Sequence, residues 1–144
     1  MGLIIRDAKK EDFELVYPLF EQLWPTKELH QEALREVFCR GVESDSDKLF
    51  CAVLDGDLIG FCAYAIMNNL WQEGRIYYIY ALVVDEKHRG KGIGSAAIQE
   101  AVAKSKCQGM KRVELDCGFH REMSHAFYEK LGFERRAYLF SYAL

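Results

Sequence analysis

The sequence has no paired-cysteine motif and no proline-rich stretch. Its five cysteines form no C-x-x-C pair and no metal-type spacing with histidine. Because the count is odd, we expect buried free thiols in a reducing compartment, with neither disulfides nor a bound metal. Only two prolines occur, Pro18 and Pro25, and no low-complexity linker divides the chain. We therefore predict a single domain over residues 1–144.

Charge and hydropathy exclude further classes of protein. The chain has 19 Lys and Arg against 22 Asp and Glu, a formal net charge of −3, so no basic surplus favours nucleic acid. No run approaches the roughly 18 apolar residues of a membrane span, and residues 1–10 lack the apolar core of a signal peptide. We predict a cytoplasmic protein that binds neither nucleic acid nor membrane.

Half of the residues are hydrophobic, which is enough for one core, and their periodicity predicts alternating helices and strands. Thr26 is the predicted N-cap of the second helix and Gly41 its end, while Gly132 closes the last helix. The predicted helices are 11–23, 27–40, 93–106 and 123–131; the predicted strands are 3–6, 49–54, 58–67, 76–84 and 112–116, followed by a strand-like tail over 133–144.

This order predicts a mixed α/β fold around a central sheet with flanking helices. Asp55-Gly56 lies between two apolar runs and is a strong hairpin signal, so the N-terminal half of the sheet should be antiparallel. The strand–helix–strand passage over 76–116 predicts a right-handed parallel crossover.

A glycine-rich loop lies between the strand ending at 84 and the helix starting near 93. Three glycines alternate at Gly90, Gly92 and Gly94, with Arg89 and Lys91 beside them. Glycine lets a backbone turn tightly and approach a ligand, and the first N–H groups of a helix are unpaired and carry a positive partial charge. A phosphate or pyrophosphate is the ligand that satisfies both features. The alternative is a tight turn with solvated basic side chains.

Two common phosphate motifs do not match this loop. A nucleotide P-loop requires Ser or Thr after its lysine, but Gly92 follows Lys91. A dinucleotide fingerprint requires G-x-G-x-x-G, whereas the spacing here is G-x-G-x-G.

The loop and the strand before it resemble the acetyl-coenzyme-A signature of the GNAT superfamily, Arg/Gln-x-x-Gly-x-Gly/Ala. The matching residues run from Leu82 through Asp85 and Arg89 to Gly94. A second segment, Ala126-Phe127-Tyr128-Glu129-Lys130-Leu131-Gly132-Phe133, resembles that family's closing motif. Together with the predicted order of elements, the resemblance covers essentially the whole chain. It implies an N-acetyltransferase that uses acetyl-CoA.

The resemblance also implies roles for individual residues. The pyrophosphate of the cofactor would lie on the backbone of the loop, and the pantetheine arm would pair with the strand edge at Leu82 and Val84. The N–H of Val83 would stabilise the oxyanion, and Tyr128 would protonate the leaving thiolate. The implied cofactor-binding residues are Leu82, Val83, Val84, Arg89, Gly90, Lys91, Gly92, Ile93, Gly94, Ser95 and Tyr128.

The general base does not follow from the resemblance. Many members carry Glu on the strand before the loop, but Tyr80 occupies that position, and a phenol with a reference pKa of about 10 is a poor base at neutral pH. The alternatives are a water chain or one of Glu73, Asp116, His120 and His125. The family's Asn near the start of the last helix is replaced by Arg121.

The acceptor is expected to be an amine, on a small molecule or a peptide. Trp24, Trp71, Tyr77, Tyr78 and Tyr80 form a predicted aromatic neighbourhood that would hold a cation through its ring faces. The competing interpretation gives these rings to the core or to a homodimer interface. Because Tyr80 replaces Glu, a non-catalytic module that binds coenzyme A is the alternative function.

Overall fold

The computed structural model describes residues 2–144, and they form two compact units, the first ending at Glu114 and the second running from Leu115 to Leu144. A five-stranded sheet has the order β1-β2-β3-β4-β5. Its strands are β1 (Leu3–Asp7), β2 (Asp47–Leu54), β3 (Asp57–Asn69), β4 (Gly74–Val84) and β5 (Val113–Leu115). The helices are α1 (Phe13–Leu23), α2 (Gln31–Glu43), α3 (Ile93–Cys107) and α4 (Glu122–Lys130), with short 3-10 turns η1 (Lys10–Asp12) and η2 (Glu86–His88). The predicted mixed α/β class is confirmed.

The predicted antiparallel half of the sheet is confirmed for β1 to β4. Asp55 and Gly56 both have positive φ, 50° and 90°, as a tight hairpin turn between twisted strands requires. The Lys111 N–H donates to Arg75 O and the Tyr77 N–H donates to Arg112 O. From the first bond to the second, the residue number increases on both segments, from 75 to 77 and from 111 to 112. The chain entering β5 therefore runs parallel to β4, as predicted.

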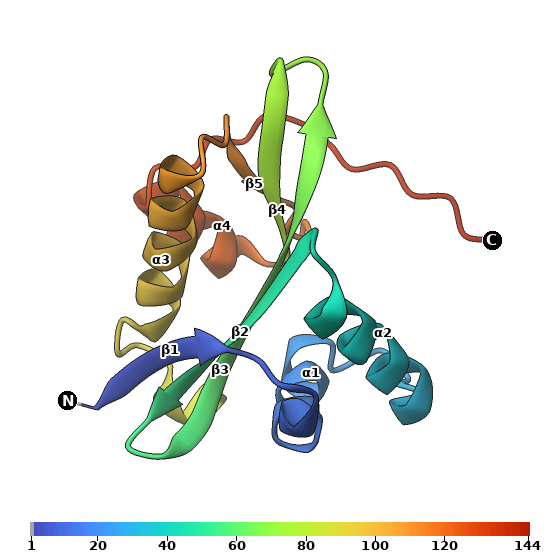
Figure 1. Ribbon diagram of the computed structural model, residues 1–144, viewed down its shortest axis with the longest axis vertical. Coiled ribbons are helices and arrows are strands. Elements are labelled where there is room, and N and C mark those ends of the chain that lie inside the picture. The colour runs from blue at the N-terminus through green and yellow to red at the C-terminus, as the bar shows by residue number, and fades with distance from the viewer. Residues whose placement is uncertain (1) are drawn as a thin grey trace. The chain divides into compact units, whose positions relative to one another are not determined.

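Helices α1 and α2 lie on one face of the sheet and α3 lies on the other (Figure 1), with an apolar layer on each face. One face packs on α1 and α2 through rings such as Phe20 and Phe38, which meet Phe61 of β3 at centroid distances of 5.3 and 5.7 Å. The other face packs on α3, where Ile93 contacts Ala52 and Ile59. The alternation of buried side chains along β3 and β4 therefore supplies both layers.

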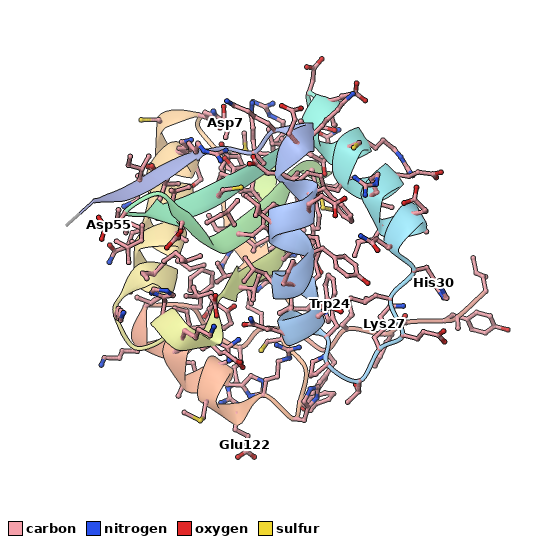
Figure 2. The ribbon with its side chains drawn as sticks, turned by 90° about the horizontal axis from the view of Figure 1, so that it is seen from below. Asp7, Trp24, Lys27, His30, Asp55 and Glu122 are labelled. Atoms are coloured by element: carbon pink, nitrogen blue, oxygen red, sulfur yellow. The ribbon has the colours of Figure 1, made fainter. Side chains whose placement is uncertain are left out.

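The start and the interior of α2 differ from the prediction. Its N-cap is His30, four residues after the predicted cap at Thr26, and Gly41 lies buried inside the helix. Figure 2 shows the loop from Trp24 through Lys27 to His30 that joins the two helices. A Cβ at position 41 would lie 2.9 Å from Leu49 Cδ1, so Gly41 provides close packing against β2 and does not act as a stop signal.

The second unit contains α4 and the tail. Gly132 has φ 101° and its N–H donates to Glu129 O at 3.0 Å, so the predicted glycine stop of this helix is confirmed. The strand-like prediction for 133–144 is wrong, because no strand is assigned there. Its large apolar side chains, which include Phe140 and Tyr142, are exposed, so an apolar pattern alone does not create a strand without a neighbouring strand to bond to.

All five cysteines are free, as predicted, but they are not all buried. Burial raises the pKa of Cys51 and of Cys62 to about 12, so both stay as unreactive thiols. Cys39 and Cys117 are half-buried, and Cys107 is exposed at the end of α3.

Candidate functional site

The candidate site is the passage from β4 through the glycine loop into α3. Gly90 and Gly92 both have φ +80°, and a Cβ built on either would meet no atom within 4 Å. Both glycines therefore adopt the left-handed conformation that L side chains disfavour, and the space in front of them is open. The sequence predicts a use for glycine's backbone freedom at these two positions, and their positive φ uses that freedom.

The start of α3 leaves backbone N–H groups outside the helical hydrogen-bond ladder. Gly92 is the N-cap, and the first intrahelical bond runs from Ala96 N to Gly92 O at 3.0 Å. The N–H groups of Ile93, Gly94 and Ser95 therefore precede the helical ladder. No acidic side chain lies in the first turn of the helix, whereas Lys104 and Lys106 lie in the last. The helix dipole is thus open to an anion at this end.

Basic side chains surround the loop. Arg89, Lys91 and the neighbouring Lys87 are exposed, and Lys91 Nζ lies 3.4 Å from His88 Nδ1. Arg89 Nε donates to Val84 O at 2.9 Å, so this side chain folds back on the end of β4. The loop has the features of a diphosphate cradle: unpaired amides, open space where a Cβ would stand, and cations.

A side chain of α1 holds the segment before the loop. The Gln22 amide oxygen accepts from Glu86 N at 2.9 Å, and its nitrogen lies 3.5 Å from Asp85 Oδ1. Asp85 also accepts from Lys87 N at 3.1 Å. That backbone bond, followed by the Gln22 contact, lowers the pKa of Asp85 below its usual value. Gln22 is a site residue that the sequence analysis did not identify, because no local motif links position 22 to position 86.

The pairing of β3 with β4 fixes which backbone groups face the outer edge. Antiparallel partners alternate between hydrogen-bonded and non-bonded pairs. The Asp85 N–H donates to Ile59 O at 2.7 Å, so Val83 opposite Phe61, two residues back, is also a bonded pair. The N–H of Val83 therefore faces β3, while the backbone groups of Leu82 and Val84 face away from it.

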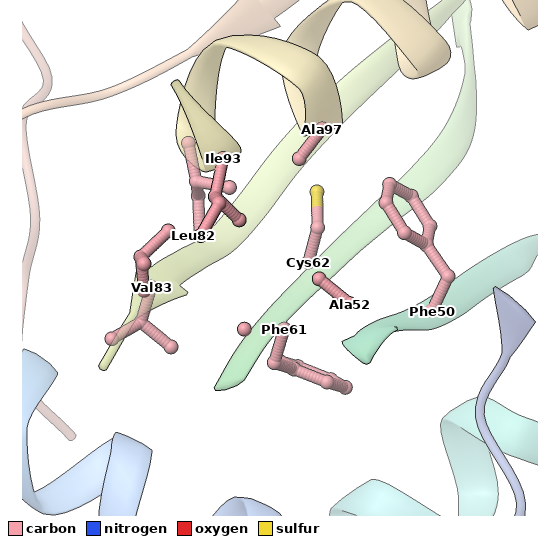
Figure 3. Close-up of a pocket in the computed structure, with 10 residues that line it drawn as sticks. Phe50, Ala52, Phe61, Cys62, Leu82, Val83, Ile93 and Ala97 are labelled. Carbon is pink, nitrogen blue, oxygen red and sulfur yellow. The ribbon is translucent and has the colours of Figure 1, made fainter. Parts of the chain in front are cut away.

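A small apolar pocket lies behind this strand end, between β2, β3, β4 and the first turn of α3. Figure 3 shows Leu82, Val83 and Ile93 on one side of it and Phe50 on the other. Its cavity volume is about 10 Å³, which is the space of one water molecule. It is a packing gap in the core and is too small for a substrate.

Tyr80 lies in a β-bulge. Tyr64 pairs with Ile79 and Ala63 with Ala81, so Tyr80 is the extra residue of β4 and projects on the same face as Ala81, toward α1 and α2. Its hydroxyl donates to Asp47 Oδ2 at 2.6 Å. Burial first, and then this hydrogen bond, raise the pKa of Tyr80 above its usual value. The sequence-based conclusion that Tyr80 is a poor base is therefore consistent with its surroundings.

The other candidate bases lie at one end of β4 and in the second unit. Glu73 precedes β4 at its far end, roughly 25 Å along the strand from Leu82. Asp116, His120 and His125 belong to the second unit, where His125 Nε2 lies 2.7 Å from Gly118 O. Within residues 2–144, no group of three His, Cys, Asp or Glu side chains is arranged to hold a metal ion.

The predicted aromatic neighbourhood does not form one surface. Tyr77 is buried on the α3 side, stacked on Tyr64 with a centroid distance of 4.1 Å. Trp24 stacks on Phe20 at 5.5 Å, and Trp71 lies in the turn between β3 and β4. On β4 itself, the strand period of two places Tyr77 on the α3 face, whereas the bulge turns Tyr80 toward α1 and α2.

Tyr128 lies in α4 among aromatic rings. Its centroid is 5.2 Å from that of Phe127 and 5.8 Å from that of Phe133. All three side chains are half-buried. Arg121, at the position of the family's Asn, is the N-cap of this helix.

A sheet edge that leads through a glycine turn into an open helix start is an arrangement in which α/β proteins bind diphosphate-containing ligands. Comparison with known proteins gives the family. The model described as acetyltransferase (GNAT) family matches residues 13–133, and the chain belongs to this family. It is an acyltransferase, and enzymes of this family use acetyl-CoA.

The relatives are N-acetyltransferases. The chain is 28% identical over 140 residues to aminoalkylphosphonate N-acetyltransferase of Salmonella typhimurium, covering 97% of this chain and 90% of that protein. It is 32% identical over 97 residues to an uncharacterized N-acetyltransferase of Methanocaldococcus jannaschii, covering 66% of this chain and 42% of that one. The chain thus spans about two-fifths of the archaeal relative's length.

A solved structure of an aminoglycoside N-acetyltransferase in complex with CoA has the same fold. The TM-score is 0.85 with 22% identity, covering 99% of this chain and 95% of that chain. None of the helices in the described part of the chain is long and apolar enough to cross a membrane.

Proposed function

We propose that this acyltransferase transfers acetyl from acetyl-CoA directly to a primary amine, with the glycine loop and the outer edge of β4 holding the cofactor. The observation that carries the proposal is the open cradle at Gly90 and Gly92, in front of the unpaired N–H groups of α3. When bound, acetyl-CoA supplies an activated thioester. The protein's own residues bind it, orient it and manage the protons.

The pyrophosphate is held by backbone groups and two cations. The proposed donors are the N–H groups of Arg89, Gly90, Lys91, Gly92, Ile93, Gly94 and Ser95, and the exposed Arg89 and Lys91 side chains add positive charge. Because the bonds come mainly from the backbone, substitutions that add a Cβ should weaken binding more than loss of one cation does.

The pantetheine arm is held by the outer edge of β4, where its amides extend the sheet as a further strand. The backbone groups of Leu82 and Val84 face this edge, whereas the N–H of Val83 faces β3. The strand register therefore favours Leu82 over Val83 as the donor to the developing oxyanion. Val83 contributes a buried side chain under the site.

Tyr128 is the proposed proton donor to the leaving thiolate. Its position in the motif that resembles the family's closing segment supports this role, and its aromatic neighbours restrict the movement of its ring. A phenol O–H is a hydrogen-bond donor that can pass its proton to a thiolate.

The acceptor class is a primary amine on a small molecule or a peptide. The names of two similar proteins point to amines, an aminoalkylphosphonate in one and an aminoglycoside in the other. Steady-state acetylation of aminoalkylphosphonates, aminoglycosides and peptide N-termini tests the proposal. Saturable transfer to at least one of them supports an enzyme, and tight acetyl-CoA binding without transfer to any would support a non-catalytic module.

Three broader proposals accompany this function. One domain over residues 1–144 is supported by the family match across both compact units. A cytoplasmic location is supported by five free thiols. A homodimer is supported by the exposed apolar tail, and light scattering coupled to size exclusion tests it.

A further inference from the structure

A hydrogen-bonded chain of three side chains lies on the face of the sheet that packs on α1 and α2. The Tyr80 hydroxyl donates to Asp47 Oδ2 at 2.6 Å, and Ser44 Oγ donates to Asp47 Oδ1 at 3.0 Å. Both oxygens of the carboxylate are therefore occupied and its orientation is fixed. Ser44 follows α2 and Asp47 opens β2, so this chain ties the end of a helix to the bulge of β4.

The bulge and a glycine create this arrangement. Without the extra residue, strand alternation would direct Tyr80 to the α3 face. On the face it occupies, a Cβ at Gly41 of α2 would lie 3.6 Å from the Tyr80 hydroxyl oxygen. Tyr80 is still 41% exposed, so a substrate can reach the ring. Along the strand it lies about 7 Å before Leu82, close to the edge where the thioester would be held.

The direction of the Tyr80–Asp47 bond decides what the phenol can do. The phenol donates its proton to Asp47, which leaves the oxygen's lone pairs able to accept an N–H from a substrate. The phenol itself stays protonated because its pKa is raised. Tyr80 is thus suited to pass a proton on, and Asp47 to receive it.

We propose that Tyr80 is the catalytic residue that contacts the acceptor amine and that Asp47 is the positioning residue that orients its hydroxyl and takes up the proton. This inference rests on the proposed acetyltransferase function. The ammonium gives one proton to Tyr80 as Tyr80 gives its own to Asp47. The freed nitrogen lone pair forms the N–C bond, and the C–S bond breaks. The thiolate takes a proton from Tyr128, and the second amine proton leaves to solvent.

Few other charged groups act on this pair. The Cys62 thiol of β3 also acts on Tyr80, and burial raises the pKa of this thiol to about 12. On α2, Arg40 is exposed and Glu43 pairs with Lys10 at 2.5 Å. Lys48 follows Asp47 on β2 and is exposed. Asp47 is therefore the proton acceptor that the hydroxyl contacts.

The test is the pH profile of acetyl transfer to an amine that the wild type accepts. We expect Asp47→Asn and Tyr80→Phe each to lower kcat at pH 7 by about 100-fold, with the acetyl-CoA KM unchanged. The loss should shrink as the pH approaches the amine's own pKa, near 10, and the double variant should be no worse than either single one. Asp45→Asn, an exposed carboxylate two residues away, is the matched control with wild-type activity.

A wild-type profile in Asp47→Asn would overturn the proposal, as would a loss of equal size at every pH, which indicates a structural role. If the wild type acetylates no amine, the proposed function itself fails, a result distinguishable from an active enzyme with unaffected variants. Acetyl-CoA thermal stabilisation of each variant shows that it is folded.

Discussion

At the scale of single residues, the backbone conformation of the glycine loop is the feature that favours cofactor binding. Gly90 and Gly92 occupy the left-handed region, and open space lies where their side chains would stand. A substitution there acts through strain and through the space it fills, and these two effects are separable by experiment.

Gly92→Val is expected to abolish measurable acetyl-CoA binding while the protein remains folded. The branched side chain would occupy the open space in front of the loop amides, and φ +80° costs an L residue about 1–2 kcal/mol. Isothermal titration with acetyl-CoA and urea unfolding measure the two effects. Gly109→Val is the matched control, because Gly109 has φ +71° and the same open surroundings after α3. Unchanged affinity in Gly92→Val would contradict the cradle.

Tyr128→Phe is expected to lower kcat by about 100-fold, because a general acid typically contributes at least that much. The acetyl-CoA KM should stay within about twofold of the wild type, since the ring and its contacts with Phe127 and Phe133 remain. Steady-state kinetics measure both constants. Tyr138→Phe, an exposed tyrosine of the same unit, provides the control, and full activity in Tyr128→Phe would remove it from the mechanism.

At the scale of secondary-structure elements, two side chains join neighbouring segments. Gln22 connects α1 to the segment between β4 and the loop. The Arg6 guanidinium on β1 bonds both oxygens of Asp12, at 2.8 and 2.9 Å, and the Lys9 N–H adds a bond of 2.7 Å. The Gln22 contacts hold the segment before the glycine loop, and the Arg6–Asp12 contacts hold the start of α1.

Gln22→Ala is expected to raise the acetyl-CoA KM by about fivefold with little change in kcat. It removes two hydrogen bonds that hold the segment before the loop, each worth about 0.5–1.5 kcal/mol at most in net stability, while leaving the groups that contact reactants in place. Steady-state kinetics with varied acetyl-CoA at saturating amine measure KM and kcat separately. Glu21→Ala, the exposed neighbour, should behave as the wild type; equal effects in both variants would exclude a specific tie.

Asp12→Asn is expected to lower the free energy of unfolding at pH 7 by about 1–2 kcal/mol, a charged hydrogen-bonded pair discounted because the Arg6 side chain is 35% exposed. The bond from Arg6 lowers the pKa of Asp12. Its contribution is therefore complete above the unfolded-state pKa near 4 and is lost as pH falls through the lower folded-state pKa.

Urea unfolding at pH 7 and at about pH 3 checks this dependence, since the difference between wild type and Asp12→Asn should shrink at the lower pH. Asp45→Asn, whose carboxylate is exposed, should show a small difference at both. A difference for Asp12→Asn that is equal at the two pH values would mean that the charge is not responsible.

At the scale of the whole molecule, the family model matches residues of both compact units. The family match and the glycine loop of the first unit both favour acetyl-CoA as the ligand. Acetyl-CoA at about 100 times its dissociation constant should stabilise the native state by about 2.7 kcal/mol, a rise in Tm of about 5–10 °C for a chain of this size. Differential scanning fluorimetry measures it. ATP and NAD at equal concentration should give much smaller shifts, and a larger shift with either would favour a nucleotide-binding protein.

The amino-acid order was sufficient for much of the fold and for the cofactor loop. Hydrophobic periodicity located each strand of the sheet to within two residues, because side chains facing a core repeat with the period of their element. The alternating glycines marked the loop because positive φ is a local requirement that only glycine meets without cost. Glycine as a helix stop signal correctly predicted Gly132 at the end of α4. The same rule was wrong at Gly41, where the glycine allows close packing against Leu49, which is distant in the sequence.

The tertiary structure decided the features that depend on contacts between distant segments. The pairing of β3 with β4 turned the Val83 N–H toward Phe61 and left Leu82 at the outer edge. A bulge that no residue type in the sequence predicts turned Tyr80 toward Asp47, 33 residues earlier. The fold also brought Gln22 to Glu86. Strand register and side-chain partners are set by which segments meet. A single sequence therefore predicts the glycine loop, whereas the Tyr80–Asp47 hydrogen bond appears only once the chain is folded.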